Sequence, residues 1–309
     1  MVELIEREVS SRPVGDRFSG HESFACRYGW LPKFHDILVR SPELVRDDEA
    51  VMVELGIGRN MVKSLRFWAQ AFGLIIDTPR QPPTPTPFAH WLLDAGTGYD
   101  PFLEDVGSLW LLHWRLVSMA KMAVWEVAFF ETPEREVLRR YLAQRVERRA
   151  LILGRKVSSV TVRQHVDIFL ATYAAPGAQS SGSVEEALAC PLQELGLVRL
   201  LPSGDRDEIV AFARGPWPHL DTSTFARILL EYWRLRAAHD STLTLRALST
   251  DFAGPGLVLR LDEGALWSHL LNVCEQYPEL FELTDGVERR AVSLKSVALA
   301  EAIRKVGYV

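Results

Sequence analysis

The stretch DDEAVMVELGIGRNMVKSLRFWAQAFGLII, residues 47–76, decides the fold of the first part of the chain. Its first residues, Asp47, Asp48 and Glu49, favour a helix N-terminus, because negative charge there complements the helix dipole. Gly56 and Gly58 then permit a tight turn, since glycine adopts backbone conformations that other residues avoid. Apolar residues recur at helical spacing over residues 59–72, and Gly73 ends the run. The stretch therefore predicts two short helices joined by a tight turn.

The second of these helices has one polar, basic side. Arg59, Lys63 and Arg66 recur at i, i+4 and i+7, opposite the apolar side. The segment LIID (residues 74–77) then predicts a short strand, and QPPTPTP (residues 81–87) predicts a proline-rich loop. The order helix, turn, helix, strand, loop is typical of a winged-helix module, in which the second helix contacts nucleic acid. An ordinary amphipathic helix with a solvated face explains the same pattern.

The rest of the chain repeats this organisation less clearly. Residues 135–150 predict a long basic helix, and residues 160–173 predict another after a serine-capped turn. Beyond a linker rich in Pro, Gly and Ser at residues 175–183, GLVRLL and EIVAFAR predict a hairpin. The fold class is therefore mainly α with short β-hairpins, in two or three helix-turn-helix or winged-helix-like modules. The predicted domains are residues 1–131, winged-helix-like; 132–180, basic and helical; and 183–309, winged-helix-like.

Charge is unevenly distributed along the chain. Overall, 35 basic and 40 acidic residues give a net charge of −5, which argues against a dedicated nucleic-acid binder. Between Thr132 and Arg163, however, basic residues exceed acidic ones by six, so the remainder carries −11. We therefore expect basic side chains to contact DNA phosphates. The predicted DNA-binding residues are Arg27, Arg59, Lys63, Arg66, Arg139, Arg140, Arg148, Arg149, Lys156 and Arg163.

Composition places the chain among globular proteins. It has 309 residues, of which 48% are hydrophobic and 24% charged, with a mean hydropathy of +0.01, so it can bury more than one core. No apolar run reaches the roughly 18 residues that span a bilayer, and the acidic N-terminus is unlike a signal peptide. The three cysteines, Cys26, Cys190 and Cys274, are too few and too scattered for a disulfide framework or a cysteine-based zinc site. We therefore expect a soluble, cytoplasmic protein with no membrane partner.

The segment FSGHESFACRYGWLPK, residues 18–33, concentrates side chains that carry chemistry. A histidine beside a carboxylate can bind a metal or relay a proton, and a tyrosine can attack phosphate. We therefore take His21 and Glu22 as candidate catalytic residues and as ligands of a divalent metal, Mg²⁺ or Mn²⁺, that activates water. Tyr28 is the catalytic alternative if a covalent tyrosyl intermediate forms. The His-Glu pair is a weak motif, however, and Arg27 with Glu22 could form a purely structural ion pair.

A second cluster, YDPFLEDVGSLWLLHW at residues 99–114, places acidic residues before a strongly apolar helix. Capping of that helix is the favoured role of these acids, and Asp105 is the third candidate ligand for the metal. His113 is expected to be a packed, hydrogen-bonded core histidine. The sequence has no P-loop, no dinucleotide fingerprint, no common hydrolase motif and no clear restriction-type nuclease core. Nucleotide hydrolysis and dinucleotide chemistry therefore lack support.

Four segments in order carry a resemblance to a known family: FSGHESFACRYGWLPK, LGIGRNMVKSLRFWAQAFGLI, TPFAHWLLD and YDPFLEDVGSLWLLHWRL. Their order is similar to that of a bacterial family, formerly of unknown function, that is encoded beside phosphorothioation genes. The family includes the SspB subunit of single-stranded DNA phosphorothioation systems. The resemblance implies a DNA-nicking or DNA-engaging component of phage defence. It also implies partners, namely a cysteine desulfurase, an ATPase and an ATP pyrophosphatase-like protein, which place sulfur at a backbone phosphate.

The residues themselves leave three functions open. The first is a metal-dependent DNA nickase, which the resemblance implies. The second is a non-catalytic winged-helix DNA-binding adaptor or regulator that recruits the modification enzymes, and it explains the missing nuclease motif more simply. The third is a protein-interaction scaffold, in which the acidic part of the chain outside residues 132–163 faces partner subunits. This function predicts no salt-dependent DNA binding.

Overall fold

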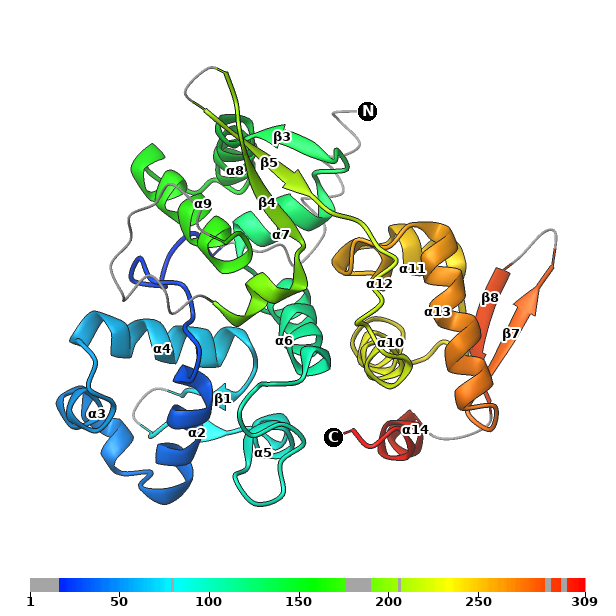
Figure 1. The fold of residues 1–309 in the computed structure, drawn as a ribbon, viewed down its shortest axis with the longest axis horizontal. Helices are drawn as coiled ribbons and strands as arrows, with labels where there is room; N and C mark the ends of the chain where they lie inside the picture. The colour runs from blue at the N-terminus through cyan, green and yellow to red at the C-terminus, as the bar shows by residue number, and fades with distance from the viewer. Residues whose placement is uncertain are drawn as a thin grey trace. The chain divides into compact units, whose positions relative to one another are not determined.

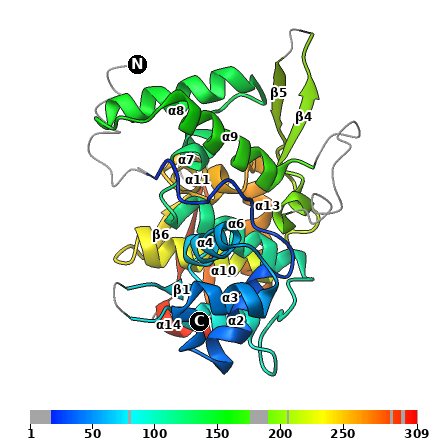
Figure 2. The same cartoon turned by 90° about the vertical axis from the view of Figure 1, so that its left-hand side faces the viewer.

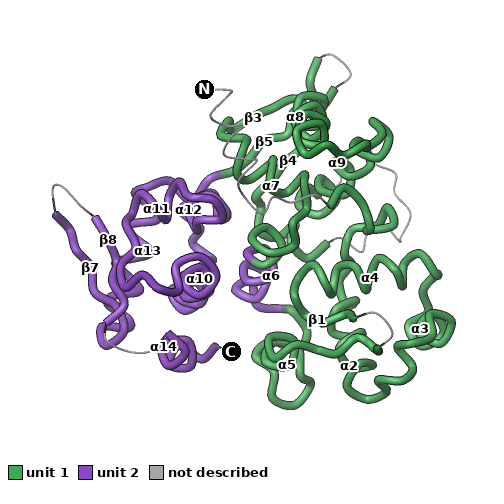
Figure 3. Tube along the Cα trace, turned by 180° about the vertical axis from the view of Figure 1, so that it is seen from behind, with its two compact units in different colours: residues 1–103, 115–213 green, residues 104–114, 214–309 purple. Residues whose placement is uncertain are grey.

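A computed structural model gives the fold of the chain and describes residues 17–78, 81–175, 190–204, 207–286, 290–295 and 299–308. It is 54% helical and 12% strand, which confirms the prediction of a mainly α protein with short β-hairpins; Figure 1 and Figure 2 show the elements from two sides. The chain divides into two compact units, coloured in Figure 3. Unit 1 comprises residues 1–103 and 115–213, and unit 2 comprises residues 104–114 and 214–309.

Both units combine helices with small antiparallel sheets. The elements of unit 1 are α2 (Trp30–Arg40), the 3-10 helix η1 (Leu44–Arg46), α3 (Asp48–Leu55), α4 (Arg59–Ala71), β1 (Ile75–Ile76), β2 (Thr84–Pro85), α5 (Pro87–Leu93), α7 (Ala123–Phe130), β3 (Glu136–Leu138), α8 (Arg139–Ile152), α9 (Ser159–Tyr173), the 3-10 helix η2 (Pro191–Leu195), β4 (Val198–Pro202) and β5 (Glu208–Phe212). Those of unit 2 are α10 (Thr222–Arg236), β6 (Thr242–Thr244), α11 (Leu245–Thr250), α12 (Pro255–Val258), α13 (Glu263–Gln276), β7 (Phe281–Asp285), β8 (Arg290–Leu294) and α14 (Leu299–Lys305). Helix α6 (Val106–Met119) is divided between the units.

Helices α3 and α4 form the helix pair that residues 47–76 predict. The side chain of Asp47 accepts a hydrogen bond from the backbone N–H of Glu49, which caps α3, and Gly56 ends α3 with φ 64, in the left-handed region that favours glycine. Helix α4 buries Leu65 and Trp68 completely. The strand predicted after α4 is β1, and it pairs with β2, which lies within residues 81–87, the stretch predicted to be a loop. The local pattern therefore predicted the helix pair and the first strand correctly but missed β2.

The second sheet of unit 1 has the order β3-β5-β4, with both pairs antiparallel. The predicted hairpin of residues 196–214 is confirmed as β4 and β5. The predicted long helix of residues 135–150 is wrong at its start, because residues 136–138 form β3 and α8 begins at Arg139. Val137 lies opposite Val210 in the sheet, so a partner more than seventy residues away overrides the helical pattern.

Unit 2 is built around α10 and α13 and includes residues 104–114 of the first half of the chain. In α6, the Trp110 ring lies 5.6 Å from that of Trp217, and His113 donates from Nε2 to the carbonyl oxygen of Val258 at 2.8 Å. Burial lowers the pKa of the fully buried His113 to about 4, so the imidazole is neutral. His113 is thus the packed core histidine that the sequence predicts.

The units do not follow the predicted domain limits of 131, 180 and 183. Strand β3, in the predicted module 132–180, shares a sheet with β4 and β5, which were predicted to belong to the C-terminal domain. Unit 2 resumes only at residue 214. The predicted linker at residues 175–183 lies, except for Ala175, outside the described residues.

No helix in the part of the chain that the structure describes is long and apolar enough to cross a membrane.

Candidate functional site

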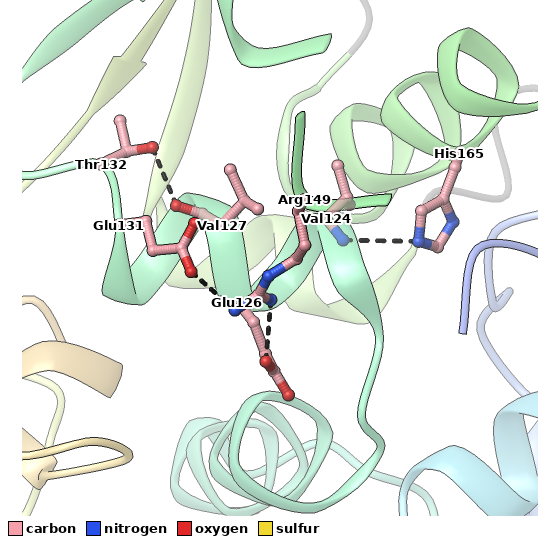
Figure 4. Close-up of polar contacts among 7 residues, drawn as sticks. All are labelled: Val124, Glu126, Val127, Glu131, Thr132, Arg149 and His165. Carbon is pink, nitrogen blue, oxygen red and sulfur yellow. Dashed lines mark hydrogen bonds and ion pairs between the residues drawn. The ribbon is translucent and has the colours of Figure 1, made fainter. Parts of the chain in front are cut away.

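The loop that precedes α2 places His21 in the core of unit 1. Only 3% of His21 is exposed, and its Nε2 lies 3.0 Å from Nδ1 of His165 on α9, with the two rings stacked. The Phe67 ring of α4 packs against it at a right angle. His165 in turn accepts a hydrogen bond at Nε2 from the backbone N–H of Val124 at 3.4 Å (Figure 4). A histidine pair therefore joins the loop to α7 and α9.

Burial keeps both histidines of this pair neutral. It lowers the pKa of His21 to about 4, and burial together with the charge interaction with His21 lowers the pKa of His165 to about 3. Nε2 of His21 and Nδ1 of His165 share one hydrogen bond. Nδ1 of His21 is buried without a hydrogen-bond partner among the described residues. This geometry suits a structural role better than solvent-accessible acid–base chemistry.

The other candidates of the loop do not gather around His21. Glu22 is exposed and has a positive φ of 48. The hydroxyl oxygen of Tyr28 is buried and lacks a hydrogen-bond partner within the described ranges, so it does not present a nucleophile at the surface. Arg27 lies over the rings of Phe24 and Trp30, at 5.8 and 5.7 Å, in place of the ion pair with Glu22 that the sequence allowed.

The predicted metal ligands are not brought together. Among the residues that the structure describes, no three His, Cys, Asp or Glu side chains gather closely enough to hold a metal ion. Asp105 lies in unit 2, whereas His21 and Glu22 lie in unit 1. Its Oδ1 accepts a hydrogen bond from the backbone N–H of Gly107 at 2.8 Å. The helix-capping role predicted for this acidic cluster is therefore confirmed for Asp105.

The basic side of α4 is largely neutralised by its own helix pair. Arg59 forms an exposed ion pair with Glu49 at 2.9 Å, and Arg66, whose side chain is only 20% exposed, pairs with Asp48 at 2.9 Å. Lys63 is exposed and forms no ion pair within the described part of the chain. Of the three cations predicted on this face, only Lys63 is therefore available without breaking an ion pair.

The basic module of α8 and α9 is similarly paired. Arg139 contacts both Asp167 and Glu208, and Arg140 lies 3.4 Å from Asp207. These carboxylates come from α9 and from the hairpin, far from α8 in the sequence. Sequence reasoning missed them because it counted charges along the chain, whereas pairing depends on which elements meet in space.

Arg149 departs furthest from the prediction, because it is buried. Its side chain is 4% exposed and pairs with Glu126 at 2.8 Å and Glu131 at 2.6 Å, as Figure 4 shows. Helical spacing places it on the inward side of α8 with Leu142 and Val146, which are fully buried. Arg149 is therefore not available to DNA phosphates, contrary to the prediction.

Three further cations predicted to bind DNA remain at the surface. Arg148 on α8, Lys156 in the turn before α9 and Arg163 on α9 are all exposed. Lys156 and Arg163 have no ion pair with any described residue. The continuous basic ridge that the sequence suggested is therefore reduced to a small number of separate exposed cations.

Unit 2 contains an open groove of about 730 Å³ between the start of α10 and α13. It is lined by apolar residues such as Trp217 and Leu220 as well as by polar ones, including the helix-capping Asp221 and Asp262 and His269, which is 9% exposed. Burial lowers the pKa of His269, so this histidine is neutral. Sequence patterns gave no signal for the groove, because its walls come from segments about fifty residues apart.

The chain matches a known family along almost its whole length. A family model described as "Protein of unknown function (DUF4007)" matches residues 18–306, whereas no curated protein matches. A crystal structure of magnesium ion-bound SspB is 31% identical and has a TM-score of 0.82; the match covers 94% of this chain and 86% of that one. Another SspB crystal structure is 30% identical over the same shares, with a TM-score of 0.81. The chain therefore belongs to the DUF4007 family and is similar to SspB throughout, as its order of motifs indicated.

Proposed function

We propose that this chain is a DNA-binding subunit of an SspB-like DNA phosphorothioation system and that it nicks DNA so that sulfur can enter the backbone. The observation that carries the proposal is the likeness to SspB over 94% of the chain at a TM-score of 0.82. A match of this extent covers both units rather than one shared module. It is supported by the four sequence motifs between residues 18 and 116 that are typical of the phosphorothioation family.

The arrangement of elements supports a DNA-binding role. In unit 1, β3, α8, α9, β4 and β5 follow one another, and the three strands form one antiparallel sheet. In unit 2, β6, α11, α12, α13, β7 and β8 repeat this order with their own three-stranded sheet. Strand, helices and hairpin in this order are typical of winged-helix modules, in which the last helix before the hairpin contacts DNA. We propose this role for α9, which exposes Arg163 and Gln164.

The ion pairs reduce the number of cations that are available for phosphate binding. Lys63, Lys156 and Arg163 are the predicted DNA contacts that are exposed and form no ion pair within the described residues. Three phosphate contacts correspond to a slope of about −3 in a plot of log affinity against log salt. We therefore expect moderate, salt-dependent DNA binding.

The partners and the metal follow from the same proposal. We propose that the chain acts with a cysteine desulfurase, an ATPase and an ATP pyrophosphatase-like protein, and that nicking uses Mg²⁺ or Mn²⁺. One of the two similar SspB structures is magnesium ion-bound. A divalent metal would activate water and stabilise charge on the phosphate.

Relaxation of supercoiled plasmid in Mg²⁺ or Mn²⁺, measured beside DNA binding, tests the proposal. The triple variant Lys63→Glu, Lys156→Glu, Arg163→Glu should weaken binding at low salt and flatten the salt dependence. Lys305→Glu, on α14, is a control for reversing one exposed lysine outside these predicted contacts, at a residue that pairs with Glu301. Absence of salt-dependent binding by the wild-type chain would contradict the proposal and favour a protein-interaction scaffold.

Glu22→Gln separates cutting from binding, because Glu22 is exposed and its replacement leaves the core intact. Loss of relaxation with retained binding would identify Glu22 as part of the cleavage site. The burial of His21 and of the Tyr28 hydroxyl favours the second candidate function, a non-catalytic DNA-binding adaptor. DNA binding by the wild-type chain without relaxation in either metal would establish the adaptor instead.

A further inference from the structure

The groove of unit 2 contains a buried polar side chain that has no hydrogen-bond partner. His269, on α13, lines the groove and is only 9% exposed, and its ring is stacked on that of Phe225, with 4.9 Å between the centroids. Neither ring nitrogen forms a hydrogen bond with a described residue, and the neutral ring offers one donor and one acceptor. Because buried polar groups are almost always hydrogen-bonded, His269 points to a partner from outside the chain.

Uncharged polar side chains extend along α13 beside this histidine. Ser268, Asn272 and Gln276 all line the groove, at intervals of four residues. Because a helix rises about 1.5 Å per residue, neighbouring members of this polar row are about 6 Å apart. An extended peptide rises about 3.3 Å per residue, so its alternate residues are about 6.6 Å apart. The polar row therefore matches the repeat of an extended peptide that lies along α13.

The polar row keeps part of its hydrogen-bonding capacity. The Ser268 hydroxyl donates to the carbonyl oxygen of Gly264 at 3.0 Å, and Nε2 of Gln276 donates to the Tyr277 hydroxyl at 3.1 Å. A side-chain oxygen of each can still accept. Asn272 is exposed and forms no hydrogen bond with any described residue. These groups suit a peptide backbone, which presents one N–H and one C=O at each residue other than proline.

The groove also has an apolar wall. The residues that form it are Pro216, Trp217, Pro218 and Leu220. The Trp217 ring is held in place, because its Nε1–H donates to the carbonyl oxygen of Leu259 at 2.7 Å. Such a wall can pack against the apolar part of a side chain, including the long stem of an arginine.

The charge of the groove favours a basic occupant. Asp221 and Asp262 line it and form no ion pair with any described residue, and none of the described residues that line it is Lys or Arg. A guanidinium group binds carboxylates through several hydrogen bonds in a fixed geometry. An arginine could thus place its stem on the apolar wall and its guanidinium group beside one of these carboxylates.

The charge of α13 argues against DNA as the occupant. Like α9 in unit 1, α13 comes before the hairpin of its module. The structure describes α13 throughout, and this helix contains no Lys or Arg, whereas Glu263 and Glu275 are exposed on it. DNA binding depends on cations that neutralise phosphates, and α13 supplies none. The two modules therefore present different surfaces, and the one in unit 2 suits a protein.

We propose that the groove of unit 2 is the docking site for an extended, arginine-containing segment of a partner protein. The backbone of this segment hydrogen-bonds with His269 and the polar row of α13. The arginine stem packs on Trp217 and Leu220, and the guanidinium group lies beside Asp221 or Asp262. This inference goes beyond the proposed function, because it requires neither DNA binding nor nicking.

Fluorescence anisotropy with the full-length chain tests the docking site. The probe is a fluorescein-labelled nonapeptide in which arginine alternates with alanine, and a second peptide has glutamate in place of arginine. The arginine peptide should bind the wild type at least about tenfold more tightly than the glutamate peptide, because like charges repel at an interface. Its affinity should fall as salt is added, because salt screens the attraction.

Two pairs of variants separate binding in the groove from general attraction to an acidic protein. Asn272→Lys adds a cation to the groove and should weaken binding by about tenfold or more. Leu271→Lys is its control: the residue is 40% exposed on the same helix but does not line the groove, so its affinity should stay close to that of the wild type. Asp262→Asn keeps a residue that can cap α13, removes a charge and should weaken binding several-fold, whereas Glu263→Gln, outside the groove, should not.

His269→Phe tests the role of the buried histidine. Phenylalanine can keep the stacking on Phe225, and the lost nitrogens have no hydrogen-bond partner among the described residues. Without peptide, the variant should therefore melt close to the wild-type temperature. Its affinity for the arginine peptide should fall several-fold, a change that a purely structural role of His269 does not predict.

The possible outcomes decide for or against the docking site. Weaker peptide binding in Asn272→Lys, Asp262→Asn and His269→Phe, but not in Leu271→Lys and Glu263→Gln, supports it. Absence of binding by the wild type, or equal loss in the groove variants and their controls, overturns it. Sedimentation velocity without peptide examines another occupant: if the wild type self-associates and Asn272→Lys does not, the groove holds a second copy of this chain and the proposal is overturned.

Discussion

Replacing Arg149 by methionine should destabilise unit 1 strongly. The guanidinium is 4% exposed and lies 2.8 Å from Glu126, which is also 4% exposed, and 2.6 Å from Glu131, which is 30% exposed. Methionine preserves much of the apolar stem but removes a counter-charge from both carboxylates. Removal of one partner from a buried ion pair typically costs about 3 to 5 kcal/mol. Because Glu131 keeps some access to water, we expect the lower end, about 3 kcal/mol.

Urea unfolding followed by tryptophan fluorescence measures this loss. Trp68 and Trp125 are buried in unit 1 and report on its packing. Arg145→Met is the matched control: Arg145 lies on the same helix and binds Glu134 through two contacts, but the two side chains are 33% and 45% exposed. Exposed pairs contribute up to about 1 kcal/mol. The midpoint for Arg149→Met should therefore fall well below that for Arg145→Met.

A second substitution tests whether charge, rather than packing, is the cause. Adding Glu126→Gln to Arg149→Met removes a buried charge that has lost a counter-charge, so the double variant should recover part of the lost stability. If Arg149→Met proves no less stable than Arg145→Met, or if the double variant is less stable than Arg149→Met alone, the argument from the buried ion pair is refuted.

Two further predictions concern the packing of the loop before α2. The pKa values of His21 and His165 lie below the ordinary value of about 6.5, so their contribution to stability is complete above about pH 6.5 and declines as the pH falls towards 4. The melting temperature should fall between pH 7 and 4.5, and a His165→Gln variant should show a shallower fall; equal slopes would contradict the assignment. Gly20→Ala should destabilise the chain by about 1 to 3 kcal/mol, because its φ is 114 and the new Cβ would lie 2.9 Å from the Phe67 ring. Gly56→Ala, with a positive φ but open space around it, is the control and should cost about 1 kcal/mol in the same melting experiment.

Local sequence patterns predicted several of the helices and one of the hairpins. The turn at Gly56, the helix from Arg59 and the β4–β5 hairpin depend on neighbours in the sequence, and the structure confirms each of them. Strand β3 was missed because its residues become a strand only through pairing with β5. The division into units was also missed, because no composition shift marks residue 104 or residue 214. Contacts between distant segments decide both features.

The candidate site was less predictable than the fold. Arg149 belongs to an inward row with Leu142 and Val146 at helical spacing, and this row could have indicated its burial. The partner of His21 lies 144 residues away on α9, and no local pattern indicates it.

The division of α6 has a consequence for biosynthesis. Trp110 and His113 are completed by Trp217 and Val258, which the ribosome adds more than one hundred residues later. Because chains grow from the N-terminus, this apolar segment emerges well before its partners and must wait for them. A nascent or truncated chain that ends near residue 213 would leave these side chains uncovered. We therefore expect such a fragment to aggregate or to require a chaperone, even though nearly all of unit 1 has been synthesised.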